Sequence, residues 1–186
     1  MNARIQELAT LIRERNAVAQ RITNVIGRPA QIGHVGEYIE YIASRVFNIQ
    51  IEESAVAKGI DGVFHSGPLA GKTVNVKFYA KREGLLDVRP DAVPDYYLVL
   101  AGPRATAITS RGEARLWHID WVFLFAGAET PVCLRSRGVK INEATSVIRE
   151  QWNRAEVYPT TSNRALSPTE EQRNMLQLFH SNEVDG

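Results

Sequence analysis

Apolar residues recur every three or four positions in two stretches near the start of the chain, and this spacing is typical of amphipathic helices. The first stretch, residues 4–26, predicts one long helix that ends at Gly27-Arg28-Pro29. Its apolar positions are Ile5, Leu8, Leu11, Ile12, Val18, Ile22, Val25 and Ile26. We expect this helix to cover the core, with a dimer contact or a phosphate-facing surface as alternatives. The second stretch predicts a helix over residues 33–47.

After Phe47 the pattern changes to the alternation of period two that marks strands. Strands are predicted over residues 47–53, 60–65, 73–79, 96–100 and 116–125. The segment Ser66–Lys72 contains two glycines and a proline, so we expect the second and third strands to form a hairpin. Residues 80–95 are charged and contain Pro90 and Pro94, which predicts a loop or an irregular crossing.

The last third of the chain predicts two further helices. The first spans residues 143–153, and the second begins at Ser167-Pro168-Thr169-Glu170, where Ser167 is the expected N-cap. Residues 154–166 are interpreted as a linker, and residues 181–186 are expected to fray. Strands and helices follow one another along the whole chain. The sequence therefore predicts a single α/β domain over residues 1–186, in which a mixed sheet is flanked by helices.

Composition and charge narrow the classes of function. The chain has 186 residues, with 22 Lys and Arg against 21 Asp and Glu, so its net charge of +1 gives no reason to expect a polyanion partner. A nucleic acid would have to be held by a local basic patch. The single cysteine excludes an internal disulfide and a cysteine-based zinc site. No apolar run is long enough for a transmembrane helix, and no signal peptide is evident, so a cytoplasmic location is expected.

Three polar residues of the predicted hairpin form the most informative group. Asn75 and Lys77 share one face of their strand, because Val74, Val76 and Phe78 occupy the other. The apolar set should face the core, which sends Asn75 and Lys77 toward a cleft or solvent. The hairpin can bring Asp61 beside them. A carboxylate that holds Mg²⁺ and a lysine that assists a water molecule suit phosphodiester hydrolysis. Ordinary hairpin and surface roles are the alternative.

The order of these segments resembles the PD-(D/E)XK nuclease superfamily, which has the restriction-endonuclease-like fold. The resemblance covers about residues 30–125 and rests on Gly33-His34-Val35-Gly36-Glu37, Gly59-Ile60-Asp61-Gly62 and Val74-Asn75-Val76-Lys77. Residues 75–102 also look like an uncharacterised bacterial domain family of this superfamily. The resemblance implies an α-β-β-β-α-β core and a Mg²⁺- or Mn²⁺-dependent endonuclease that cuts DNA, in restriction or DNA processing. It implies Asp61, Glu37 and the carbonyl of Val76 as metal ligands, and Lys77 as the catalytic lysine.

Two positions depart from the family motif. Ile60 replaces a common proline, and Asn75 stands where the motif has a carboxylate. Because an amide oxygen is a weaker Mg²⁺ ligand than a carboxylate, either another carboxylate compensates or metal binding is weak. Glu37 is the preferred compensator and Glu40 the next, while Asp87 and Asp95 are weaker candidates. The alternative function is therefore a catalytically impaired module that binds nucleic acid or a protein partner.

The remaining charged groups are less specific. Phosphate contacts are expected of Lys81, Arg82 and Arg89, with Arg135, Arg137 and Lys140 as a second basic cluster, although solvated surface is an alternative for both. His118 and Asp120 could pair as a base and its orienter in an unrelated α/β enzyme. Gly71-Lys72-Thr73 enters a strand, so it predicts no nucleotide-binding loop. A homodimer is possible because two-fold symmetry matches duplex DNA, with the first helix as one candidate interface.

Overall fold

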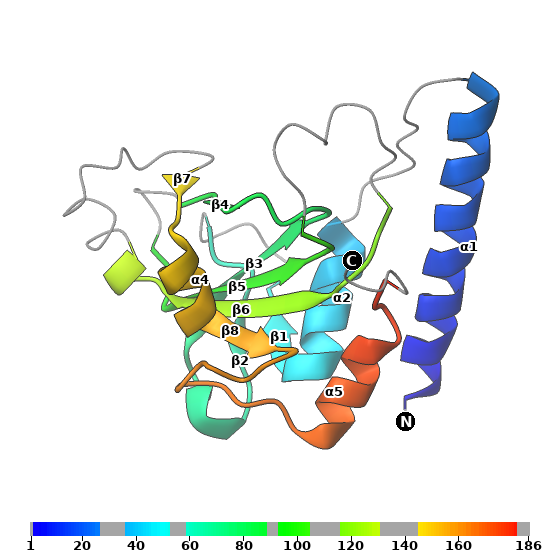
Figure 1. Cartoon of the computed structure of the whole chain (residues 1–186). Coiled ribbons are helices and arrows are strands. Elements are labelled where there is room, and N and C mark those ends of the chain that lie inside the picture. Colours follow the sequence, from blue (N-terminus) through cyan, green and yellow to red (C-terminus); the bar gives the residue numbers. More distant parts are fainter. Residues whose placement is uncertain are drawn as a thin grey trace.

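The computed structural model describes residues 2–26, 36–52, 59–88, 93–104, 116–130 and 145–181. Within them, one mixed sheet has the strand order β1-β2-β3-β5-β6-β8 (Figure 1). Its strands are β1 (Ile49–Ile51), β2 (Gly62–Phe64), β3 (Thr73–Tyr79), β5 (Tyr96–Ala101), β6 (Trp121–Ala126) and β8 (Glu156–Tyr158). The β3–β5 pair is parallel and the other neighbouring pairs are antiparallel.

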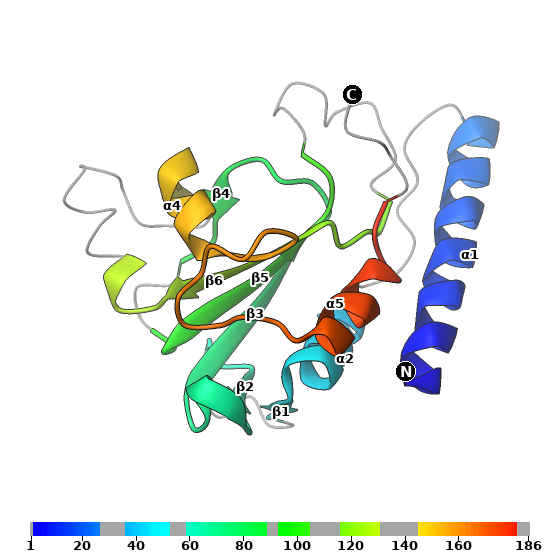
Figure 2. The same ribbon diagram turned by 60° about the horizontal axis from the view of Figure 1, so that its bottom comes forward.

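Helices cover both faces of this sheet (Figures 1 and 2). Helices α1 (Ala3–Ile26), α2 (Gly36–Phe47) and α5 (Glu170–Gln177) contribute to one core cluster, and α4 (Arg149–Ala155) contributes to the other. The alternating side chains of β5 and β6 divide between them, because Leu98 and Leu124 lie in the first cluster while Val99 and Phe123 lie in the second. Apolar strands buried on both faces explain the near-continuous hydrophobic runs of this part of the sequence.

The predicted hairpin is confirmed, with β2 and β3 pairing antiparallel through Gly62 and Val74. A 3₁₀ helix, η1 (Gly67–Leu69), forms the connection between the strands. Gly67 and Gly71 both have φ of +79°, a conformation that glycine adopts at little cost. The predicted bounds of β3 are those observed, and the two N-terminal helices lie where expected.

The connection from β3 to β5 differs from the α-β-β-β-α-β order that the resemblance implies. Its described residues, 80–88 and 93–95, contain the short strand β4 (Leu85–Leu86) and no helix. β4 pairs with β7 (Thr145–Ser146) in a separate two-stranded sheet. The mixed α/β architecture is thus established, whereas membership of the restriction-endonuclease-like fold stays a prediction.

Several predicted boundaries in the second half of the chain were wrong. Strand β6 begins at Trp121 rather than at residue 116, and α4 begins at Arg149 because β7 occupies the start of the predicted helix. Residues 154–166 are not a linker, since β8 pairs with β6 in the main sheet. The N-cap of α5 is Thr169 instead of Ser167, and its hydroxyl accepts a hydrogen bond from the backbone N–H of Gln172.

The two ends of the described chain belong to the same core as the sheet. Ile5 and Ile12 of α1 are buried in the first cluster, as are Met175 and Leu176 of α5. The first helix therefore covers the core, as expected from its apolar pattern. Ser181, expected to fray, is buried, while residues 182–186 lie outside the described residues. In the described part of the chain, no helix combines the length and the apolar character that crossing a membrane requires.

Candidate active site on strands β2 and β3

The backbone N–H and C=O of Asp61 both form hydrogen bonds with neighbouring segments of the chain. Its N–H donates to the carbonyl of Val74 (2.9 Å), and its carbonyl accepts from the N–H of Glu52 (3.0 Å). The next residue must be small, because a Cβ on Gly62 would lie 2.4 Å from the carbonyl oxygen of Gln50. The hydrogen bonds and the close packing together fix where the Asp61 side chain leaves the main chain.

The carboxylate of Asp61 reaches strand β3. Its Oδ2 accepts a hydrogen bond from the N–H of Val76 at 2.7 Å. An extended residue directs its N–H and its C=O to the same side of the strand, so the Val76 carbonyl faces the Asp61 side as well. Burial raises the pKa of Asp61, while the Val76 N–H and the nearby Lys77 ammonium partly oppose that rise. Asp61 is thus a half-buried carboxylate whose negative charge is incompletely compensated.

Asn75 and Lys77 share a face of β3, as the alternation predicts, but that face is not an open cleft at Asn75. Asn75 is only 8% exposed, and its Oδ1 is buried without a hydrogen-bond partner. The expectation that Asn75 points to a cleft or solvent was wrong, because the second core cluster covers this face of the neighbouring strands. An unpaired buried amide oxygen costs on the order of 1–3 kcal/mol. Such an atom calls for a specific explanation.

Tyr97 is a member of this group that sequence reasoning missed. The parallel register places Tyr97 of β5 opposite Asn75, and the Nζ of Lys77 lies 6.0 Å from the centre of its ring. Tyr97 is 1% exposed, and Lys77 is half-buried. The signal was the Tyr96-Tyr97 pair at the start of an apolar strand. It could be used only once the β3–β5 register was known.

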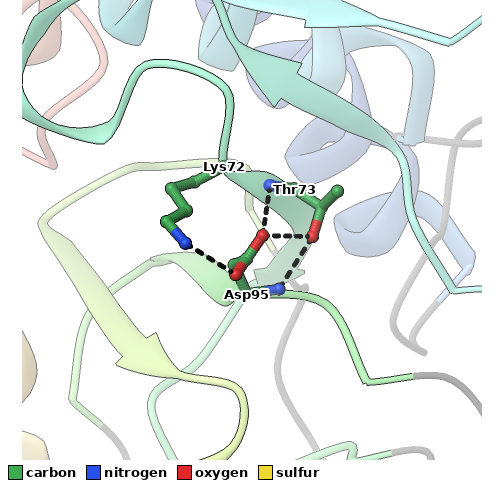
Figure 3. Close-up of polar contacts among 3 residues, drawn as sticks. All are labelled: Lys72, Thr73 and Asp95. Carbon is green, nitrogen blue, oxygen red and sulfur yellow. Dashed lines mark hydrogen bonds and ion pairs between the residues drawn. The ribbon is translucent and has the colours of Figure 1, made fainter.

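The weaker acidic candidates, Asp95 and Asp87, both form hydrogen bonds with residues of β3. Asp95 joins the starts of β3 and β5, because its Oδ2 accepts from both the N–H and the hydroxyl of Thr73, each at 2.9 Å (Figure 3). These bonds, with Lys72 at 3.3 Å, lower the pKa of Asp95. The backbone N–H of Asp87 donates to the hydroxyl of Tyr79 at 2.9 Å.

The two glutamates proposed as compensating ligands belong to α2. The side chain of Glu37 lies outside the described residues, and Glu40 is a half-buried residue of α2. Among the described side chains, no three His, Cys, Asp or Glu residues come together in a group suited to a metal. The candidate oxygen donors of this segment are the Asp61 carboxylate, the Asn75 amide and the Val76 carbonyl. These are the hard donors that Mg²⁺ prefers, but they carry one negative charge.

The basic residues expected to contact phosphate are only partly described. Arg82 is 7% exposed, and its guanidinium lies 4.6 Å from the ring centre of Trp121 and 4.9 Å from that of Phe123. Burial, followed by Arg104, lowers the pKa of Arg82, and Glu156 partly opposes this. Arg82 is therefore a packed part of the second core rather than a surface grip on phosphate. Lys81 is half-buried, and the positions outside the described residues are Arg89, Arg135, Arg137 and Lys140.

Asp120, the carboxylate of the alternative pair with His118, forms hydrogen bonds with the C-terminal segment. Asp120 is buried, and its two carboxylate oxygens accept from the N–H and the hydroxyl of Ser181, each at 2.7 Å. The imidazole of His180 lies 3.6 Å from this carboxylate. A serine hydroxyl that donates directly to the carboxylate lacks the serine–histidine–carboxylate relay of a hydrolase. This cluster therefore holds the C-terminal segment against the start of β6.

No family model and no curated protein sequence matches this chain. The assignment of a function therefore depends on the chemistry of the residues themselves.

Proposed function

We propose that the chain is a metal-dependent nuclease that hydrolyses phosphodiester bonds of DNA, with Asp61, Asn75 and Lys77 at its centre. The observation that carries this proposal is the Asp61 carboxylate bonded to the N–H of Val76, with the Lys77 ammonium nearby. Asn75, the residue before Val76, has a buried amide oxygen without a hydrogen-bond partner. A bound cation would stabilise both a half-buried carboxylate and an amide oxygen that lacks a hydrogen-bond partner.

Each residue has a distinct part in this proposal. Asp61, Asn75 and the Val76 carbonyl would hold Mg²⁺ or Mn²⁺, with Glu37 as a further ligand from α2. The ion, when bound, supplies Lewis acidity toward a phosphate and acidifies a bound water. The N–H of Val76 orients the Asp61 carboxylate. Lys77, held half-buried near the Tyr97 ring, would offset charge that develops on the phosphate and would orient the attacking water.

Cleavage assays with three variants test the assignment. Purified protein is incubated with plasmid and with single-stranded DNA, in Mg²⁺ or Mn²⁺. We expect Asp61→Asn and Lys77→Ala each to lower the cleavage rate about 100-fold or more, because each removes a charge at the reacting phosphate. Lys72→Ala is the matched control, since Lys72 is an exposed lysine paired with Asp95. Cleavage that persists unchanged in Asp61→Asn and Lys77→Ala would refute the proposed site.

A second candidate function is a nuclease-fold module without catalytic activity, which binds nucleic acid or a protein partner. It is favoured by the burial of Asn75 where the motif has a carboxylate. It predicts no cleavage under any metal condition and DNA binding that weakens as salt rises.

Asn75→Asp separates the two functions. A carboxylate at the buried position 75 should lower the thermal midpoint in EDTA, because burial of an additional charge is unfavourable. Mn²⁺ should raise the thermal midpoint of this variant by several degrees more than that of the wild type. If the natural site has too little negative charge to hold the metal, the variant should also cleave DNA faster. If Mn²⁺ shifts neither protein and neither cleaves DNA, the binding module is the better description.

A further inference from the structure

Helix α1 carries a second apolar stripe besides the one that packs on the domain. The buried positions are Ile5, Ala9, Ile12, Asn16 and Ala19. The other stripe contains three large apolar side chains that are strongly exposed, namely Leu11 (55%), Val18 (46%) and Ile22 (39%). It explains why the sequence shows more apolar positions on this helix than the core accommodates.

The exposed stripe has the spacing of a coiled-coil seam. Together with the partly exposed Leu8 and Arg15, it occupies positions 8, 11, 15, 18 and 22, in steps of three and four residues. This alternation keeps one seam facing a partner helix over several turns. Helix α1 has 24 residues, which corresponds to a length of about 36 Å at the rise of an α-helix. Figures 1 and 2 show it at the side of the molecule, joined to the rest along one flank.

The charges beside the seam indicate which partner fits. On the flank away from the domain, the exposed residues at heptad spacing are Glu7, Glu14 and Arg21. If a second α1 lies antiparallel with Leu11 against Ile22, Glu14 of each helix meets Arg21 of the other, and the pair forms twice. Arg15 then lies against Val18. In a parallel arrangement Arg15 would face Arg15, and Glu14 would face the flank that carries Ala19, which is buried against its own domain.

We propose that α1 pairs antiparallel with α1 of a second copy of this chain through Leu8, Leu11, Val18 and Ile22, with reciprocal ion pairs between Glu14 and Arg21. The buried stripe lies on a different side of the helix from the seam, so α1 can pack on its own domain through one stripe and on a partner helix through the other. This inference does not rest on the proposed nuclease function.

The mass in solution provides the first test. Sedimentation or light scattering at about 50 µM protein should give twice the monomer mass of 20.8 kDa, for a dissociation constant in the micromolar range. Leu11→Asp/Val18→Asp should give the monomer mass with an unchanged circular dichroism spectrum, because both side chains are exposed. Ala17→Asp/Asn24→Asp, on exposed positions away from the seam, adds the same charge and should remain a dimer.

A charge exchange tests the orientation. Glu14→Arg alone and Arg21→Glu alone should each weaken the dimer about tenfold, since each creates two like-charge contacts. The double variant Glu14→Arg/Arg21→Glu should restore affinity to within about threefold of the wild type. A monomeric wild type would overturn self-pairing and leave the stripe to a different partner. A dimer that survives Leu11→Asp/Val18→Asp, or single variants that the exchange does not rescue, would overturn this interface.

Discussion

At the scale of single residues, the ionised carboxylate of Asp61 destabilises the folded protein because it is half-buried. Burial raises its pKa above the ordinary value of 3.8, so between that value and the folded-state pKa the unfolded chain is ionised while the folded chain is still protonated. The free energy of unfolding therefore falls as pH rises through this window, and the loss is complete above the folded-state pKa. A carboxylate kept at such a cost is characteristic of functional sites.

Asp61→Asn should consequently stabilise the protein at neutral pH. The neutral amide avoids the penalty of burying charge, and its Oδ1 can still accept from the N–H of Val76. In EDTA we expect the thermal midpoint to rise by about 2–4 °C at about pH 7. The gain should disappear below pH 3.8, where both states of the wild type are protonated. A midpoint that falls at neutral pH would mean that the ionised Asp61 stabilises the fold.

At the scale of elements, the beginning of α5 depends on a local hydrogen-bond exchange. The Thr169 hydroxyl accepts from the N–H of Gln172 at 3.3 Å, and the Gln172 side chain accepts from the N–H of Thr169 at 2.7 Å. The same Gln172 side chain donates to the carbonyl of Val46 in α2 at 2.7 Å. The capping box thereby ties α5 to the helix that leads into β1.

Thr169→Ala should lower the free energy of unfolding by about 1 kcal/mol, because it removes an N-cap oxygen. Ser167→Ala is the matched control and should change stability by less than about 0.5 kcal/mol, as expected for a surface position outside the cap. Urea unfolding measures both. Equal losses in the two variants would contradict the assignment of the cap to Thr169.

The elements also differ in how far the sequence predicts them. Strand β3 was predicted to the residue, because its alternation is local and a glycine-rich turn precedes it. Strand β8 was missed because Glu156, Val157 and Tyr158 are only three residues followed by a proline, and their pairing with β6 is long-range. The candidate site divides in the same way. The common face of Asn75 and Lys77 follows from period two, whereas the burial of Asn75 and the place of Tyr97 depend on the β3–β5 register.

At the scale of the whole molecule, the C-terminal segment is fastened to the sheet by one buried carboxylate. Asp120 accepts two hydrogen bonds from Ser181, and Ile119 donates its N–H to the carbonyl of Phe179 at 3.0 Å. These contacts join residues about 60 positions apart in the sequence. Residues 178–181, which follow α5, are therefore part of the cooperative fold.

Asp120→Ala should lower the free energy of unfolding by about 2–3 kcal/mol, because it leaves the buried N–H and hydroxyl of Ser181 without their acceptor. Ser181→Ala should cost about 1 kcal/mol, since only one of the two bonds is lost. Urea unfolding of both single variants and the double variant measures the coupling. If Asp120→Ala lies within 0.5 kcal/mol of the wild type, the contact has no part in global stability.

Among the described residues, the two outermost strands of the main sheet are β1 and β8, and each is three residues long. Exposed sheet edges are where other chains add strands in aggregation and amyloid growth, and a short edge offers few free backbone groups for that growth. The sheet of this protein is therefore a poor template for edge-to-edge polymerisation. We expect concentrated solutions to stay free of fibrils, whereas the pairing proposed for α1 would close at two chains.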